Sequence, residues 1–255
     1  MKTLQEHCAD LVQFFGALAD FRGYEGAEDV AAWLNLSACI QSVDYDTSLF
    51  NTGFGVCGPA DDWADRQVAL QQKLVTEIAR FQFCWSALEV AIDKYVPTSA
   101  GPQGKINKLC YYLKNMYSLS TLPLGYLELS NSLECSNVRK RLSEHIRKPR
   151  EFLSQHGYGV YSVYQLRNEI AHGAFEIPID DGNRNGILED LTTSSKIVLL
   201  TIQMLMLTKY PEDYIEVFWK NHMPVTVSFE DFLTTIHVDN KLYLSNSELD
   251  EILGL

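Results

Sequence analysis

The longest stretch without glycine or proline, residues 60–96, constrains the fold most. Asp62 is a good N-cap residue, and Pro97 follows the last residue of the stretch, so we expect one helix from Asp62 to Val96. At 1.5 Å per residue it is about 50 Å long. Its apolar residues recur at alternating steps of four and three, which predicts one buried face: Leu74, Ile78, Phe81, Trp85, Leu88, Ile92 and Tyr95. A helix of this length packs against other helices along most of its length, so the sequence predicts a mainly α fold, a helical bundle.

Helical spacing of apolar residues recurs elsewhere in the chain. We expect the helix after residue 136 to bend or break at Pro149, and the last helix to continue beyond Pro211 as YIEVFWKNHM. The segments with this spacing are residues 11–21, 28–40, 105–119, 136–157, 160–173 and 187–207.

Other segments favour loops and a small β element. Residues 42–60 are rich in Gly, Ser and Asp and predict a long loop, and residues 121–130 and 180–186 predict a connector and a polar turn. In the tail, VTVSF and KLYL alternate apolar and polar residues, which predicts a hairpin or edge strands before a short helix at 245–255. We therefore divide the chain into an irregular N-terminal extension (1–60), the bundle (61–210) and a C-terminal extension (211–255).

Composition favours an intracellular globular protein. Hydrophobic residues make up 46% and charged residues 21% of the 255 residues, which is ordinary for a folded domain. The six cysteines form no CxxC pair, and the N-terminus lacks the basic start and cleavage site of a signal peptide, so we expect free thiols and a cytoplasmic location. The apolar run at 197–207 is far shorter than the ~20 residues of a membrane span, so we expect a buried helix and no membrane contact.

The charge is distributed unevenly. A net charge of −12 disfavours broad nucleic-acid binding, which needs a basic surface. Residues 139–150 nevertheless carry six basic residues and one acid, Glu144, so this segment has a charge of +5. It is either a solvated helix face or a patch that contacts a few phosphates, in which case the substrate-binding side chains are Arg139, Lys140, Arg141, Arg147, Lys148 and Arg150.

The segment LRNEIAHG at 166–173 is the strongest candidate for a site. On a helix through 160–172, Val163, Leu166 and Ile170 form the inward stripe, and Asn168 and His172 share another face. Arg167 and His172 lie about 140° apart around a regular helix. They can act together if the helix loosens at its last turn before Gly173, or if two copies of the chain face each other.

These residue types suit phosphate chemistry. The arginine fork binds a phosphate and stabilises its added transition-state charge, whereas histidine, with an ordinary pKa of about 6.5, exchanges a proton near neutral pH. Asn168 can orient either group. No HxxxH, DxD or paired cysteines lie near the motif, so we expect no metal and no cofactor. Because RNA supplies its own 2′-OH nucleophile, these groups suffice for strand cleavage that leaves a 2′,3′-cyclic phosphate.

A purely structural interpretation stays open for each candidate. An arginine or histidine in a last helical turn can simply satisfy carbonyl groups and the helix dipole. Glu89 either orients a catalytic group or is a solvated glutamate. Tyr164, like Tyr161, is a core or rim aromatic unless it stacks on a base.

The motif resembles the Arg-x(4–6)-His signature of HEPN domains, here as Arg167-Asn168-x-x-x-His172 of the RNxxAHG type. FQFCWSALEVAID at 81–93 is similar to the F-x-x-x-W-x-x-x-E helix that precedes the motif in some of these families, and the resemblance covers about residues 62–210. It implies an antiparallel all-α bundle, often a homodimer with a composite cleft. Many such proteins are metal-independent endoribonucleases of toxin–antitoxin, CRISPR or anti-phage systems, and others bind without cutting. By this resemblance Arg167 grips the scissile phosphate, His172 is the general acid or base and Asn168 positions them.

Three hypotheses follow. The first is a HEPN ribonuclease, whose acidic body suggests a restricted substrate such as one tRNA region, or an antitoxin or defence-system partner that supplies RNA binding. The second is a non-catalytic HEPN module that binds a protein or nucleotide and regulates it. The third is a helical scaffold in which Arg167 and His172 only cap a helix.

Overall fold

The computed structural model describes residues 1–46, 58–99, 101–135, 150–175, 177–178, 184–218 and 224–238. The predicted mainly α fold is confirmed over these residues, and a two-stranded sheet lies near the C-terminus. The helices are α1 (Leu4–Arg22), α2 (Ala27–Cys39), α3 (Gly58–Tyr95), α4 (Lys105–Met116), α5 (Tyr126–Cys135), α7 (Gln155–Ala171), α8 (Arg184–Lys209) and α9 (Phe229–Leu233). The strands are β1 (Tyr214–Phe218) and β2 (Pro224–Ser228).

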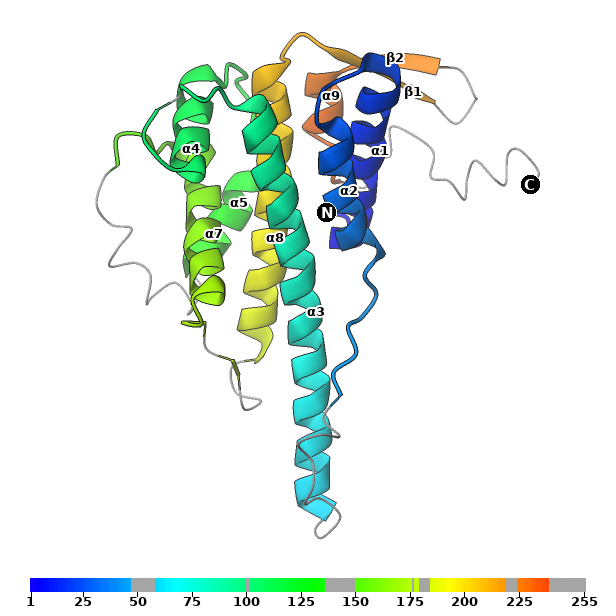
Figure 1. The fold of residues 1–255 in the computed structure, drawn as a ribbon, viewed down its shortest axis with the longest axis vertical. Helices are drawn as coiled ribbons and strands as arrows, with labels where there is room; N and C mark the ends of the chain where they lie inside the picture. The colour runs from blue at the N-terminus through cyan, green and yellow to red at the C-terminus, as the bar shows by residue number, and fades with distance from the viewer. Residues whose placement is uncertain are drawn as a thin grey trace, which may run out of the picture.

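Two long helices, α3 and α8, run side by side through the middle of the fold (Figure 1). The pair α1 and α2 packs on one side of them, together with α9. On the other side α7 packs against both α4 and α5, and all three helices also reach α8. The candidate motif on α7 therefore lies on the side of the core opposite α1 and α2.

Helix α3 begins at Gly58, so the predicted start at Asp62 is wrong by one turn. Pro59 falls in the first turn, where a helix needs no N–H donor, and it therefore permits the earlier start. The predicted apolar stripe is buried except at Ile78, which is partly buried. Burial of this stripe fixes the rotation of α3 about its axis and therefore fixes where its charged residues lie.

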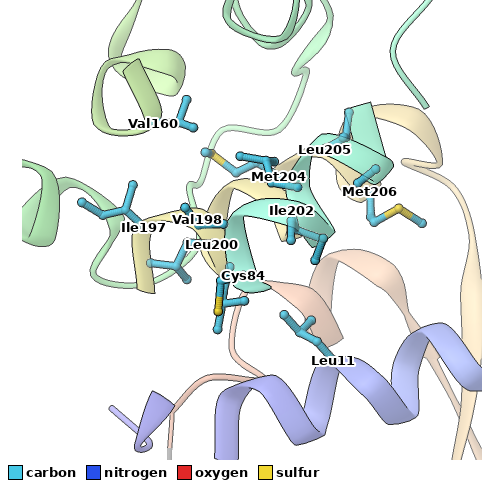
Figure 2. Close-up of a cluster of buried hydrophobic side chains, with 14 of the residues drawn as sticks. Leu11, Cys84, Val160, Ile197, Val198, Leu200, Ile202, Met204, Leu205 and Met206 are labelled. Carbon is cyan, nitrogen blue, oxygen red and sulfur yellow. The ribbon is translucent and has the colours of Figure 1, made fainter. Parts of the chain in front are cut away.

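Helix α8 is apolar around most of its circumference because other helices surround it. Figure 2 shows Leu11 of α1, Cys84 of α3 and Val160 of α7 near its side chains. Three of its buried hydroxyl groups, on Ser195, Thr201 and Thr208, donate to carbonyl groups within the helix; Thr201 donates to the Ile197 carbonyl over 2.7 Å. By length and composition alone Gly186–Lys209 could cross a membrane, but 89% of its most apolar window is buried inside the fold. A core helix passes the same test.

Helices α1 and α2 belong to the same apolar cluster as α3 and α8. The chain after α2 is fixed to α3, because Arg80 donates to the Ile40 carbonyl at 2.8 Å and to the Gln41 carbonyl at 2.9 Å, and Thr76 accepts from the Val43 N–H at 3.0 Å. The division of the chain at residue 60 stays a prediction, and residues 47–57 of its expected loop lie outside the described residues.

A buried polar network joins α1, α8 and the turn after α9. His7 Nε2 lies 2.8 Å from Gln203 Oε1, Gln203 Nε2 lies 3.2 Å from His237 Nδ1, and His237 Nε2 lies 2.6 Å from the Leu124 carbonyl. Two neutral imidazoles that both donate through Nε2 give every bond one donor and one acceptor. Burial, and secondarily the neighbouring His237, lowers the pKa of His7 to about 3.

Two predicted segments have a different structure. Residues 121–130 are only partly a connector, because α5 begins at Tyr126 directly after Gly125, whose φ of 81° ends the irregular segment. Residues 214–218 do not continue α8, and residues 219–223 of the predicted continuation lie outside the described residues. Residues 214–218 form β1, in which β-branched and aromatic residues pair antiparallel with β2, from Tyr214 opposite Ser228 to Phe218 opposite Pro224.

The predicted strand VTVSF is confirmed as β2, but its partner is β1. Helix α8 starts at Arg184, so residues 184–186 of the predicted polar turn are helical. Residues 136–149, KLYL at 241–244 and the short helix at 245–255 lie outside the described residues.

Candidate functional site

Helix α7, which carries the candidate motif, is held closely against α4 and α5. Its N-cap Ser154 accepts a hydrogen bond from the His156 N–H, and Tyr126 donates to the His156 carbonyl over 2.9 Å. A Cβ on Gly159 would lie 2.3 Å from Ser130 Oγ, so only glycine lets the two helices approach this closely. The contacts fix the N-terminal half of α7 and thereby the direction of its C-terminal end.

The C-terminal end of α7 is a Schellman motif. The helix ends at Ala171, His172 is the C-cap residue, and Gly173 has a left-handed φ of 69°. The Ala174 N–H donates to the Glu169 carbonyl at 2.8 Å and the Gly173 N–H to the Ile170 carbonyl at 3.3 Å. The imidazole of His172 therefore leaves the helical spiral and is exposed.

Arg167, one and a half turns earlier, faces α3. Its Nη2 lies 4.0 Å from Oε1 of Glu89, and the two side chains are 32% and 37% exposed. This distance exceeds that of a hydrogen bond, so the ion pair is loose. Arg167 Nε is buried and has no hydrogen-bond partner among the described residues. The guanidinium thus retains unsatisfied N–H capacity beside a carboxylate.

Trp85 connects the two helices at this point. It is 2% exposed, and its indole N–H donates to Glu89 Oε1 over 2.7 Å, one turn along α3. Its ring stacks on Tyr164 with centroids 6.2 Å apart and planes 15° apart. The sequence indicated Trp85 as a core residue and, through the F-x-x-x-W-x-x-x-E resemblance, as part of a family pattern, but it assigned Trp85 no contact with Glu89, although a Trp and a Glu four residues apart on one helix are in reach of each other.

Tyr164 belongs to a row of aromatic side chains that ends at Arg150. Its ring centroid lies 6.2 Å from that of Tyr161, and the guanidinium carbon of Arg150 lies 5.1 Å from the Tyr161 centroid. Burial raises the pKa of the Tyr161 hydroxyl. Arg150 is exposed and is the only residue of the predicted basic patch among those that the structure describes. The other five, which lie outside the described ranges, are Arg139, Lys140, Arg141, Arg147 and Lys148.

The structure brings together Arg167, Glu89 and, through Trp85, Tyr164. Asn168 is half-buried, and its carbonyl accepts the His172 N–H at 2.9 Å. No hydrogen bond or ion pair joins Arg167 to His172 in the described part of the chain. The two candidate groups therefore leave the end of α7 in different directions, one toward α3 and one to solvent.

Comparison of the chain with protein-family models, with curated proteins and with solved structures returned no match. The chemistry of the site follows from its own side chains. The Arg167 guanidinium, whose side chain is 32% exposed and whose Nε has no partner among the described residues, can bind a phosphate, and an exposed imidazole can exchange a proton with a bound substrate.

Proposed function

We propose that the chain is a metal-independent endoribonuclease of the HEPN type. The observation that carries the proposal is the state of Arg167: among the described residues Nε has no hydrogen-bond partner, and the Glu89 carboxylate lies 4.0 Å from Nη2. An arginine that serves only to cap or to brace a helix would have these donors satisfied. The motif ends in a Schellman turn that leaves His172 accessible.

The reaction needs few groups. The RNA 2′-oxygen attacks the adjacent phosphorus while the bond from phosphorus to the 5′-oxygen breaks, giving a 2′,3′-cyclic phosphate and a 5′-hydroxyl. Arg167 binds the phosphate oxygens and stabilises the charge that develops on them. His172 either takes the 2′-OH proton or donates one to the leaving 5′-oxygen. Asn168, between them in sequence, positions the end of the helix.

A homodimer supplies the second proton-transfer group. One imidazole cannot be acid and base in a single concerted step, so a second copy's histidine takes the other role. Arg167 and His172, which diverge around α7, would each complete a site with groups from the facing copy. Arg150 and the rest of the basic patch would bind the flanking backbone of a restricted RNA, such as one tRNA region.

The test is to incubate wild type and His172→Ala with total cellular RNA in EDTA and to sequence the fragment ends. We expect discrete fragments with 2′,3′-cyclic phosphates, and a rate at least about 100-fold lower for the variant, the usual loss of a general acid or base. Gln165→Ala, a half-exposed position on the same helix, is the control and should stay within a few-fold of wild type. Intact RNA with a folded dimeric protein, or cleavage that survives in His172→Ala, would contradict the proposal.

The net charge of −12 favours a second candidate, a non-catalytic HEPN module that binds a protein or nucleotide partner. In that case no RNA is cut by any variant, and Arg167→Ala weakens association with the partner. Pull-down with wild type and Arg167→Ala in parallel, with recovery of one partner by wild type only, would support this alternative.

A further inference from the structure

One carboxylate oxygen of Glu89 lies close to Trp85 and farther from Arg167. Oε1 of Glu89 lies 2.7 Å from the Trp85 indole nitrogen and 4.0 Å from Arg167 Nη2. We infer that Trp85 is a positioning residue that holds Glu89 back from Arg167 and so keeps the partly exposed guanidinium unpaired and able to bind a phosphate. This inference rests on the proposed function of Arg167.

The unpaired edge is identifiable from the arginine's own geometry. Nε–H and Nη2 lie on the same side of the planar guanidinium and together form one of the edges that grip a carboxylate or phosphate with two bonds. In this structure Nε is buried with no partner among the described residues, and Nη2 is the atom nearest Glu89. The edge therefore faces a carboxylate that does not close on it.

An unrestrained glutamate would close on that edge, because a two-bond pair with arginine satisfies the buried N–H and both charges. Trp85 can prevent this since its own position is fixed. It is buried in the core, and its ring stacks on Tyr164, three residues before Arg167 on α7. The bond it donates is one turn along the same helix and goes to a charged acceptor, which makes it strong.

Glu89 therefore attracts Arg167 electrostatically without forming a hydrogen bond to it. A phosphate that binds the guanidinium then displaces no hydrogen-bonded Glu89 carboxylate from it. Without the indole N–H, Glu89 would become an internal competitor of the substrate.

The first test measures binding of a short, fluorescent 2′-O-methyl RNA of mixed sequence, which the proposed reaction cannot cut. We expect Trp85→Phe to weaken binding about tenfold, the effect of one hydrogen bond to a charged group. In a Glu89→Gln background, where no carboxylate can close on Arg167, the same Trp85→Phe change should alter the affinity by less than about twofold. An equal loss in both backgrounds would overturn the inference, because Trp85 would then act only through packing.

The second test needs no RNA. The Arg167 Nε–H resonance, assigned by its loss in Arg167→Lys, should shift downfield and exchange more slowly with water in Trp85→Phe, and should not do so in Trp85→Phe with Glu89→Gln. If Trp85→Phe fails to fold, benzothienylalanine at position 85 keeps both rings and replaces only the N–H by sulfur. An unchanged resonance would overturn the inference. A shifted resonance with no RNA bound by any variant would support the restraint and overturn the nuclease proposal.

Discussion

Acid should destabilise the fold through His7. Burial, followed by the charge of His237 and those of Lys2 and Lys196, lowers the pKa of His7 from 6.5 to about 3. The His7 imidazole of the unfolded chain therefore takes up a proton near pH 6.5, whereas that of the folded chain stays neutral until the pH approaches 3. The stabilisation from the neutral imidazole is complete above this pH and is lost as the pH falls toward 3.

The size of this loss in the free energy of unfolding follows from the two pKa values of His7. At about pH 5 the unfolded imidazole is mostly protonated and the folded one is neutral, so the loss is about 1.5 pH units at 1.36 kcal/mol each, or about 2 kcal/mol. His237, whose pKa burial also lowers, adds to the loss in the same direction.

The assay is urea unfolding, followed by circular dichroism, at about pH 7.5 and pH 5 for wild type and His7→Gln. Glutamine keeps an N–H that can donate to Gln203 Oε1, the partner of His7 at 2.8 Å, but it does not titrate. We expect the free energy of unfolding of the variant to fall by about 2 kcal/mol less than that of wild type over this range. Parallel losses in the two proteins, or a His7 NMR titration midpoint near 6, would show that His7 is not the source of the acid sensitivity.

Three further predictions concern backbone positions. Gly159→Ala should lower the free energy of unfolding by about 1–3 kcal/mol in a thermal unfolding assay, because the new Cβ meets Ser130 Oγ at 2.3 Å. Gly16→Ala in α1, whose new Cβ has nothing within 4 Å, should be neutral or stabilising in the same assay. Thr3→Ala removes the capping box of α1 and should cost about 0.5–2 kcal/mol in denaturant titration. Gly173→Ala forces an L-residue to a φ of 69° and should lower the free energy of unfolding by about 1 kcal/mol in chemical unfolding. The same variant should cleave RNA more slowly, and an unaltered cleavage rate would count against a role for the helix end.

The sequence predicted helices wherever apolar spacing was long and regular, as at 60–96 and 187–207, because burial of one face decides such segments. It failed at 121–130 and 214–218, where few residues form each element and the partner strand or helix decides the structure. β1 contains a glutamate and two aromatic residues that suit either state alone, and pairing with β2 selects the strand.

At the candidate site, spacing along the chain predicted the helix end at Gly173 and the divergence of Arg167 from His172. It did not predict the bond from Trp85 to Glu89 or the stack of Trp85 on Tyr164. The side-chain rotamers and the crossing of α3 with α7 determine these contacts, and both are set by packing across the whole bundle.

The single apolar cluster that extends from Leu4 to Ile236 has a consequence for how the molecule opens. Arg80 ties the chain after α2 to α3, and α1 and α2 share the apolar cluster with α3. Detachment of α1 and α2 would therefore expose the central apolar side chains to water. Native-state hydrogen exchange should therefore show amides of α1 opening only with those of α8, in one cooperative event. Proteolysis between residues 40 and 60 would then leave two fragments that remain associated.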